Sequence, residues 1–155
     1  MRQFLLPALA LAALSGCVAS KSYGNFLSAP AAAIDTKVAV KFVDRLSALY
    51  PPASTRFMLQ HETSDAFGTG LVAALRSAGY EVLEFDARLA AWAEHGSGRD
   101  GASPRSEFPL SYVVDQFSEL YRVTLIIDGK QALTRVYRLA ANGQVDPAGY
   151  WIRKE

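Results

Sequence analysis

The only cysteine in the chain, Cys17, combines a residue type and a position that imply a specific covalent chemistry. It ends the sequence Leu14-Ser15-Gly16-Cys17, which follows an apolar N-terminal run and has the pattern of a bacterial lipobox. Small residues before the cysteine let the peptide enter a protease site, and the thiol accepts diacylglycerol. We therefore expect diacylglycerol and an N-acyl lipid on Cys17, and no cofactor. The alternative is an ordinary signal peptide that happens to contain a cysteine.

The residues before the cysteine have the layout of a cleavable signal. Arg2 gives a basic start, and residues 4–14 form an apolar stretch. A helix that spans a bilayer needs about 20 residues, so this stretch is too short and residues 1–16 are predicted to be removed. Val18 stands where Asp is the usual inner-membrane retention signal of enteric bacteria. This favours the outer membrane, with the lipid as anchor and the domain facing the periplasm.

Other residues that could carry chemistry do not form a catalytic pattern. His61 and His95 lack the His-Glu-x-x-His spacing of a zinc protease, and Ser97 lies between glycines in an expected loop rather than on a nucleophile elbow. A phosphate site at the helix that follows Asp65 is excluded, because no glycine-rich loop precedes it and Glu62 and Asp65 would repel an anion. We predict no enzyme, no metal site and no small-molecule substrate. A small periplasmic hydrolase is the weakest alternative.

Two groups of charged residues need an interpretation. The first contains Glu81, Glu84 and Asp86 near a strand end, and the second contains Lys130, Arg122, Arg135 and Arg138 on a predicted hairpin. We interpret both as solvated charge. The basic group could otherwise bind an acidic partner or lipid headgroups.

Composition indicates one domain on a tether. Without residues 1–16 the chain has 139 residues, with 15 basic and 15 acidic side chains, so it has no electrostatic signature of nucleic-acid binding. No disulfide can form, and the 17 aromatic residues must supply packing instead. Residues 17–33 are predicted to be the lipidated cysteine and a flexible tether averaging roughly 20 to 25 Å, and residues 34–155 the periplasmic domain. Phe26 and Leu27 are expected to be isolated apolar residues, unless they dock on the domain or a partner.

Apolar spacing predicts two helices, the first over residues 31–50. Its apolar positions are Ile34, Val38, Phe42, Leu46 and Leu49, and Pro51 and Pro52 end it. Residues 55–60, a second helix capped by Asp65, and residues 80–85 predict a β-α-β unit with parallel strands. Gly68 and Gly70 inside the second helix suggest close approach to the sheet.

The last third of the chain is predicted to be β-rich. Residues 94–107 form an expected mobile loop, followed by strands at 110–117, 121–127, 131–139 and 150–152, with Asp128-Gly129 as a tight hairpin turn. The predicted fold class is α+β: a two-layer sandwich with two helices on a mixed sheet of about five or six strands, containing one β-α-β unit and a C-terminal hairpin.

The chain resembles the TrbH family of conjugal transfer lipoproteins in several short sequence features. The matching features are the lipobox, residues 31–35 (AAAID), 49–53 (LYPPA) leading to Phe57, 65–68 (DAFG), and Leu75-Arg76 with Gly79-Tyr80. The resemblance implies a structural part of the mating-pair formation apparatus, a plasmid-encoded type IV secretion system. It implies other channel proteins as partners and no enzymatic role. The alternative is a general periplasm-facing outer-membrane lipoprotein that binds a ligand or assists envelope assembly.

Overall fold

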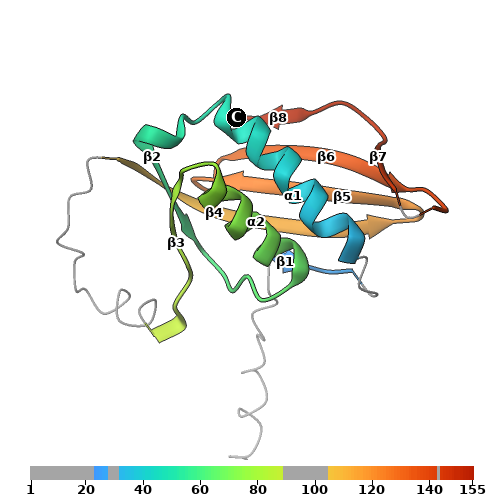
Figure 1. Ribbon diagram of the computed structural model, residues 1–155, viewed down its shortest axis with the longest axis horizontal. Coiled ribbons are helices and arrows are strands. Elements are labelled where there is room, and N and C mark those ends of the chain that lie inside the picture. Colours follow the sequence, from blue (N-terminus) through green and yellow to red (C-terminus); the bar gives the residue numbers. More distant parts are fainter. Residues whose placement is uncertain (1–22, 28–31, 89–104, 143) are drawn as a thin grey trace, which may run out of the picture.

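The computed structural model describes residues 23–27, 32–88, 105–142 and 144–155. Two α-helices, α1 (Ala32–Ser47) and α2 (Ala66–Ser77), pack against each other on one face of a mixed β-sheet (Figure 1). A short 3₁₀ turn, η1 (Pro52–Ser54), connects α1 to the sheet. The α+β class and the two-layer arrangement predicted from the sequence are therefore confirmed.

The sheet contains six strands in a continuous path and two short ones beside it. The path is β3 (Glu81–Leu83), β2 (Thr55–Leu59), β4 (Ser106–Phe117), β5 (Leu120–Ile127), β6 (Gln131–Leu139) and β7 (Val145–Pro147). β5 occupies one edge of β4, so β2 and β1 (Gly24–Asn25) share the other edge, opposite residues 106–110 and 113–114. In the same way, β7 and β8 (Ile152–Lys154) share the outer edge of β6.

The β-α-β unit follows the predicted pattern. In β2 the side chains alternate, with Thr55, Phe57 and Leu59 buried beneath the helices, and β2 runs parallel to both β3 and β4. The hairpin turn also forms as predicted: Asp128 and Gly129 have φ of 55° and 64°, which a primed turn requires.

Several predicted boundaries are wrong, among them the strand predicted over 80–85, which spans only Glu81–Leu83. The helix predicted to reach Tyr50 ends at Ser47. β4 begins at Ser106 rather than Leu110, because its polar first residues pair with β2, so the last residues of the loop predicted over 94–107 are strand and residues 94–104 lie outside the described residues. The closing strand is at 152–154 rather than 150–152, since Trp151 packs edge-on against Phe42 at 4.7 Å while Tyr150 is exposed.

The core lies between the helices and the sheet. Its largest fully buried side chains are Tyr112, Tyr137, Phe42, Phe57, Phe67, Leu46, Leu59, Leu71, Leu75, Leu110 and Leu125. From α1 these include the predicted inward positions Phe42 and Leu46, whereas the side chain of Ile34 lies outside the described residues. The aromatic side chains therefore fill the core, as expected for a chain without a disulfide.

Candidate functional site

The described chain begins close to the predicted lipid attachment point. Cys17 and the rest of the lipobox lie outside the described residues, which start at Tyr23. The segment from Tyr23 to Leu27 was predicted to be part of a flexible tether, but it docks on the sheet. Gly24 and Asn25 pair with Val113 and Val114 of β4, in parallel. The domain therefore begins about ten residues earlier than the predicted boundary at residue 34.

Side chains and backbone together hold this segment. The backbone N–H of Phe26 donates to the carbonyl oxygen of Val114 at 2.8 Å, and Asn25 Nδ2 donates to Asp65 Oδ1 at 3.3 Å. Leu27 packs partly buried against the core, whereas Phe26 remains 52% exposed. Leu27 therefore docks on the domain, and the interpretation of both residues as isolated apolar side chains is wrong for Leu27.

His61 fills the gap between β2 and β1 along the edge of β4. Its Nε2 accepts the backbone N–H of Tyr112 at 3.2 Å, and its Nδ1 lies 2.9 Å from the carbonyl oxygen of Glu62. An N–H can only donate and a carbonyl can only accept, so this geometry requires a neutral imidazole with its proton on Nδ1. The ring also stacks on Tyr23, with centroids 6.0 Å apart. The His61 side chain thus accepts a backbone N–H of β4 that a residue of a neighbouring strand would otherwise accept.

Asp65 connects α2, β1 and β4. Its Oδ1 accepts the backbone N–H of Gly68 at 3.1 Å, which is the predicted helix cap, and its Oδ2 accepts the hydroxyl of buried Tyr112. A Cβ at Gly68 would overlap that hydroxyl and lie 2.8 Å from Cα of Thr63. The predicted close approach of helix to sheet is confirmed at Gly68.

Gly70 serves a different contact. A Cβ there would lie 3.2 Å from Cα of Thr36 in α1, so this glycine lets the two helices approach each other. The prediction that Gly70 faces the sheet is therefore wrong. An α-helix turns by about 100° per residue, so Gly70, two residues after Gly68, lies on a different face of α2. That face is directed toward α1.

A cleft of about 470 Å³ opens beside these residues, at the carboxyl ends of β2 and β3. It is lined by Tyr23, Gly24, Asn25, Phe26, Gln60, His61, Glu62, Ser64, Asp65 and Phe85. Among the described residues that line it, the charged ones are the carboxylates Glu62 and Asp65, and none is a lysine or arginine. The cleft can therefore accept an uncharged or cationic group against aromatic rings, and it disfavours an anion.

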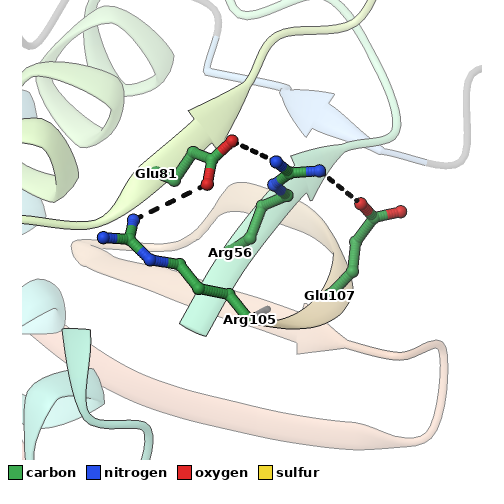
Figure 2. Close-up of polar contacts among 4 residues, drawn as sticks. All are labelled: Arg56, Glu81, Arg105 and Glu107. Carbon is green, nitrogen blue, oxygen red and sulfur yellow. Dashed lines mark hydrogen bonds and ion pairs between the residues drawn. The ribbon is translucent and has the colours of Figure 1, made fainter. Parts of the chain in front are cut away.

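The three acidic residues predicted as one group, Glu81, Glu84 and Asp86, each bind a different partner. Figure 2 shows Arg56 between Glu81 and Glu107 on three adjacent strands, with Arg105 reaching Glu81 at 3.6 Å. The hydrogen bond from Arg56 to Glu81 raises the pKa of Arg56 further above its already high value.

The other two acidic residues of that group have partners of their own. Glu84 pairs with Arg76 at 2.6 Å, and Asp86 accepts the backbone N–H of Arg88 at 2.8 Å. The described part of the chain contains no cluster of three or more His, Cys, Asp or Glu that could hold a metal, and His95 lies outside it.

The basic residues predicted as one group lie on both faces of the sheet. Arg122 pairs with Asp115 on the open face, and Lys130 reaches Asp128 at 3.5 Å. Arg135 instead faces the helices, with its guanidinium 4.8 Å from the ring centre of Trp151. The interpretation as solvated charge is therefore confirmed for Arg122, Lys130 and Arg138, which are exposed, and wrong for Arg135, because β6 alternates and places its odd-numbered residues on the covered face.

The fold and the site do not by themselves identify the family to which the chain belongs, whereas comparison with known families does. A family model described as "Conjugal transfer protein TrbH" matches residues 20–155. The chain belongs to the TrbH family. No curated protein and no solved structure matches it. The matched range includes residues 65–68 (DAFG), which contain the Asp65 cap and the close approach at Gly68, so in this chain these residues position α2 on the sheet.

TrbH membership makes this a protein of conjugal transfer, a process of the cell envelope. Among the described residues, no helix is long and apolar enough to cross a bilayer. Sequence reasoning identified the cap and Gly68, but it missed the docking of β1 and the role of His61. Both depend on a strand partner far along the chain, for which local sequence carries no signal.

Proposed function

We propose that this TrbH-family protein is an outer-membrane lipoprotein, attached through Cys17, that acts as a structural component of a conjugative type IV secretion apparatus. The observation that carries the proposal is the family match over residues 20–155. The lipobox at Leu14–Cys17 supports the anchor, since acylation holds a protein on a membrane without a spanning helix. The neutral mature chain supports a scaffold rather than a nucleic-acid binder.

The cleft is the surface that we assign to a neighbouring conjugation protein. Its carboxylates and aromatic rings suit a segment that presents a lysine or arginine side chain. Glu62 is exposed at this cleft. Glu62→Lys should lower mating efficiency at unchanged protein level, whereas Asp44→Lys, an exposed charge reversal on α1, should not. Equal mating by both variants would remove this assignment.

Lipid attachment is tested by labelling and fractionation. Cells expressing the chain should incorporate radioactive palmitate into it, and Cys17→Ser should abolish the label, remove the protein from the outer-membrane fraction and lower mating. A second variant, residues 18–155 behind a non-lipoprotein signal peptide, should be soluble in the periplasm. Ser20→Ala, outside the lipobox, is the control and should behave as wild type. An unlabelled wild-type protein, or unchanged fractionation of Cys17→Ser, would refute the proposal.

A further inference from the structure

Aromatic and basic side chains meet at the outer edge of β6. β7 and β8 share that edge (Figure 1), and the chain between them contains Tyr150, whose side chain is 93% exposed. Trp151 follows, and its ring centre lies 4.8 Å from the guanidinium of Arg135. The indole also packs edge-on against Phe42 of α1, with ring centroids 4.7 Å apart. Trp151 therefore holds Arg135 in a fixed position beside α1.

Arg135 has hydrogen-bonding capacity that the described chain does not use. Its Nε is buried without a hydrogen-bond partner, and no described carboxylate forms an ion pair with its guanidinium. Its terminal nitrogens are not among the buried unpaired atoms, so they are open to an acceptor from outside the chain. Tyrosine, tryptophan and arginine are the residue types that dominate binding energy at protein interfaces. Tyr150, Trp151 and Arg135 together therefore have the composition of an interface.

Helix α1 adds positive charge on the same side of the molecule. Lys37, Lys41 and Arg45 recur every four residues, so they form a stripe along the helix, and all three are exposed. None of them forms an ion pair with a described residue. Val43 lines the groove beside α2, so the stripe lies toward the other side of α1, where α1 contacts β7. We call Lys41, Arg45, Arg135 and Tyr150 together the basic edge.

The cleft beside β1 has the complementary charge and lies across the sheet. β1 and β2 share one edge of β4, whereas β8 lies outside β6, so β4, β5 and β6 separate the cleft from the basic edge. In the cleft, Glu62 is exposed and forms no ion pair with a described residue. The α1 stripe spans about 12 Å, which matches a compact acidic cleft rather than the long phosphate track of a nucleic acid.

We propose that copies of this chain associate head to tail, with the basic edge of one copy docked on the Glu62 cleft of the next. The cleft suits a cation beside an aromatic ring, and the basic edge presents both. Because the two surfaces lie on opposite sides of the sheet, each copy contacts two neighbours, and the contact repeats into a ring or a filament. This inference rests on the proposed function and deepens it: the conjugation protein at the cleft is another copy.

Disulfide crosslinking of the acylated full chain on vesicles of phosphatidylethanolamine and phosphatidylglycerol tests the contact. Cys17 is the only cysteine and is acylated, so each introduced cysteine supplies the only free thiol. Ser64→Cys marks the cleft, and Gly149→Cys, where a Cβ has nothing within 4 Å, marks the basic edge without altering Tyr150. The two proteins carry tags of different size and are mixed before oxidation. Asp44→Cys, exposed on the α2 side of α1, replaces Gly149→Cys in the control.

We expect the 64–149 product to exceed the 64–64, 149–149 and 64–44 products severalfold. In the same mixture, Glu62→Lys or Arg45→Glu in both proteins should lower the 64–149 yield severalfold, and the two together, which exchange the charges, should restore most of it. These residues are exposed, so the fold does not depend on them. Arg76→Glu, an equal charge reversal on exposed α2, is the control and should leave the yield unchanged.

Equal yields of all products, or charge exchange without recovery, would overturn the head-to-tail contact while leaving the lipid anchor intact. A predominance of 64–64 or 149–149 products would overturn it as well, because identical positions meet only in a two-fold contact. Failure of the anchor is seen separately, as absence of palmitate label. In that event the same crosslinks are measured on the Cys17→Ser chain in solution, with the same outcomes deciding.

Discussion

Gly68 is the residue at which the contact between α2 and the sheet is most sensitive to one added atom. Its missing side chain lets the Tyr112 hydroxyl reach Asp65, and a Cβ there would collide with that hydroxyl and with Thr63. Within a helix, Gly→Ala normally gains about 1 kcal/mol. Here we expect Gly68→Ala to lose about 1–3 kcal/mol of unfolding free energy, as overpacking does.

Urea denaturation of the purified variant measures this loss. Gly149→Ala is the control, because a Cβ there has nothing within 4 Å, and it should shift the midpoint little. If Gly68→Ala were as stable as Gly149→Ala, the close approach described for Tyr112 would be wrong.

Tyr137 should make stability depend on pH above 10. Burial raises its pKa to about 12, opposed by the nearby positive charge of Arg135, and its hydroxyl has no hydrogen-bond partner among the described residues. Between pH 10 and 12 the unfolded chain loses the phenolic proton while the folded chain keeps it, so the unfolding free energy falls as pH rises. Below pH 10 both states hold the proton and this contribution is fully present.

Tyr137→Phe removes both the proton and the unpaired hydroxyl. We expect equal or slightly higher stability at pH 7, and a shallower fall between pH 10 and 12. Some slope remains, because burial also raises the pKa of Tyr50 and Tyr80. Urea titrations at a series of pH values measure the slope, and superimposable profiles of variant and wild type would contradict the assignment.

β1 is the element whose stability is most separable from the rest of the fold. It contributes two paired residues, one backbone hydrogen bond from Phe26 to Val114, and the Asn25–Asp65 bond. Asn25→Ala should therefore speed amide exchange in residues 23–27 severalfold while changing global unfolding by less than about 1 kcal/mol. Hydrogen exchange followed by mass spectrometry measures this, with Asn142→Ala in the β6–β7 turn as control. Unprotected amides in the wild-type segment would show that β1 does not dock.

Elements with local signals were predictable, and those that depend on distant partners were not. The Asp128-Gly129 turn and the α2 cap are encoded by adjacent residue types, so the hairpin and the β-α-β unit followed from the sequence. β1 has two residues, one of them glycine, and its partner lies almost ninety positions away. The start of β4 was hidden because Ser106 and Glu107 are polar and Pro109 is a poor strand former.

The candidate site shows the same contrast between local and distant signals. Cys17 is predicted from a contiguous motif and stays a prediction, because it lies outside the described residues. His61 acquires its role from a gap between two strands that only the assembled sheet creates. Arg135 was predicted to be solvated, but it lies on the face covered by the helices. Successive residues of a strand point to opposite faces, so a shift of one residue in the strand register would reverse the face on which Arg135 lies.

Charge compensation across the molecule leads to a final prediction about DNA. Residues 17–155 carry 15 basic and 15 acidic side chains, and many of the described arginines face carboxylates, as Arg56 and Arg122 do. Non-specific DNA binding requires several cations that displace counterions along a phosphate backbone. A protein that transports DNA by contact would need such a surface, whereas a scaffold around the channel would not.

We expect no shift of single- or double-stranded DNA in a gel assay at 50 mM salt with protein up to about 100 µM, which is the weak limit of the usual range of non-specific dissociation constants. A triple variant, Glu62→Lys, Asp44→Lys and Glu119→Lys, raises the net charge by six and should begin to bind, which shows that the assay can detect binding. Salt-sensitive binding by the wild-type protein would mean that its charges are not compensated in solution. In that case the protein would belong among the components that contact the transferred strand.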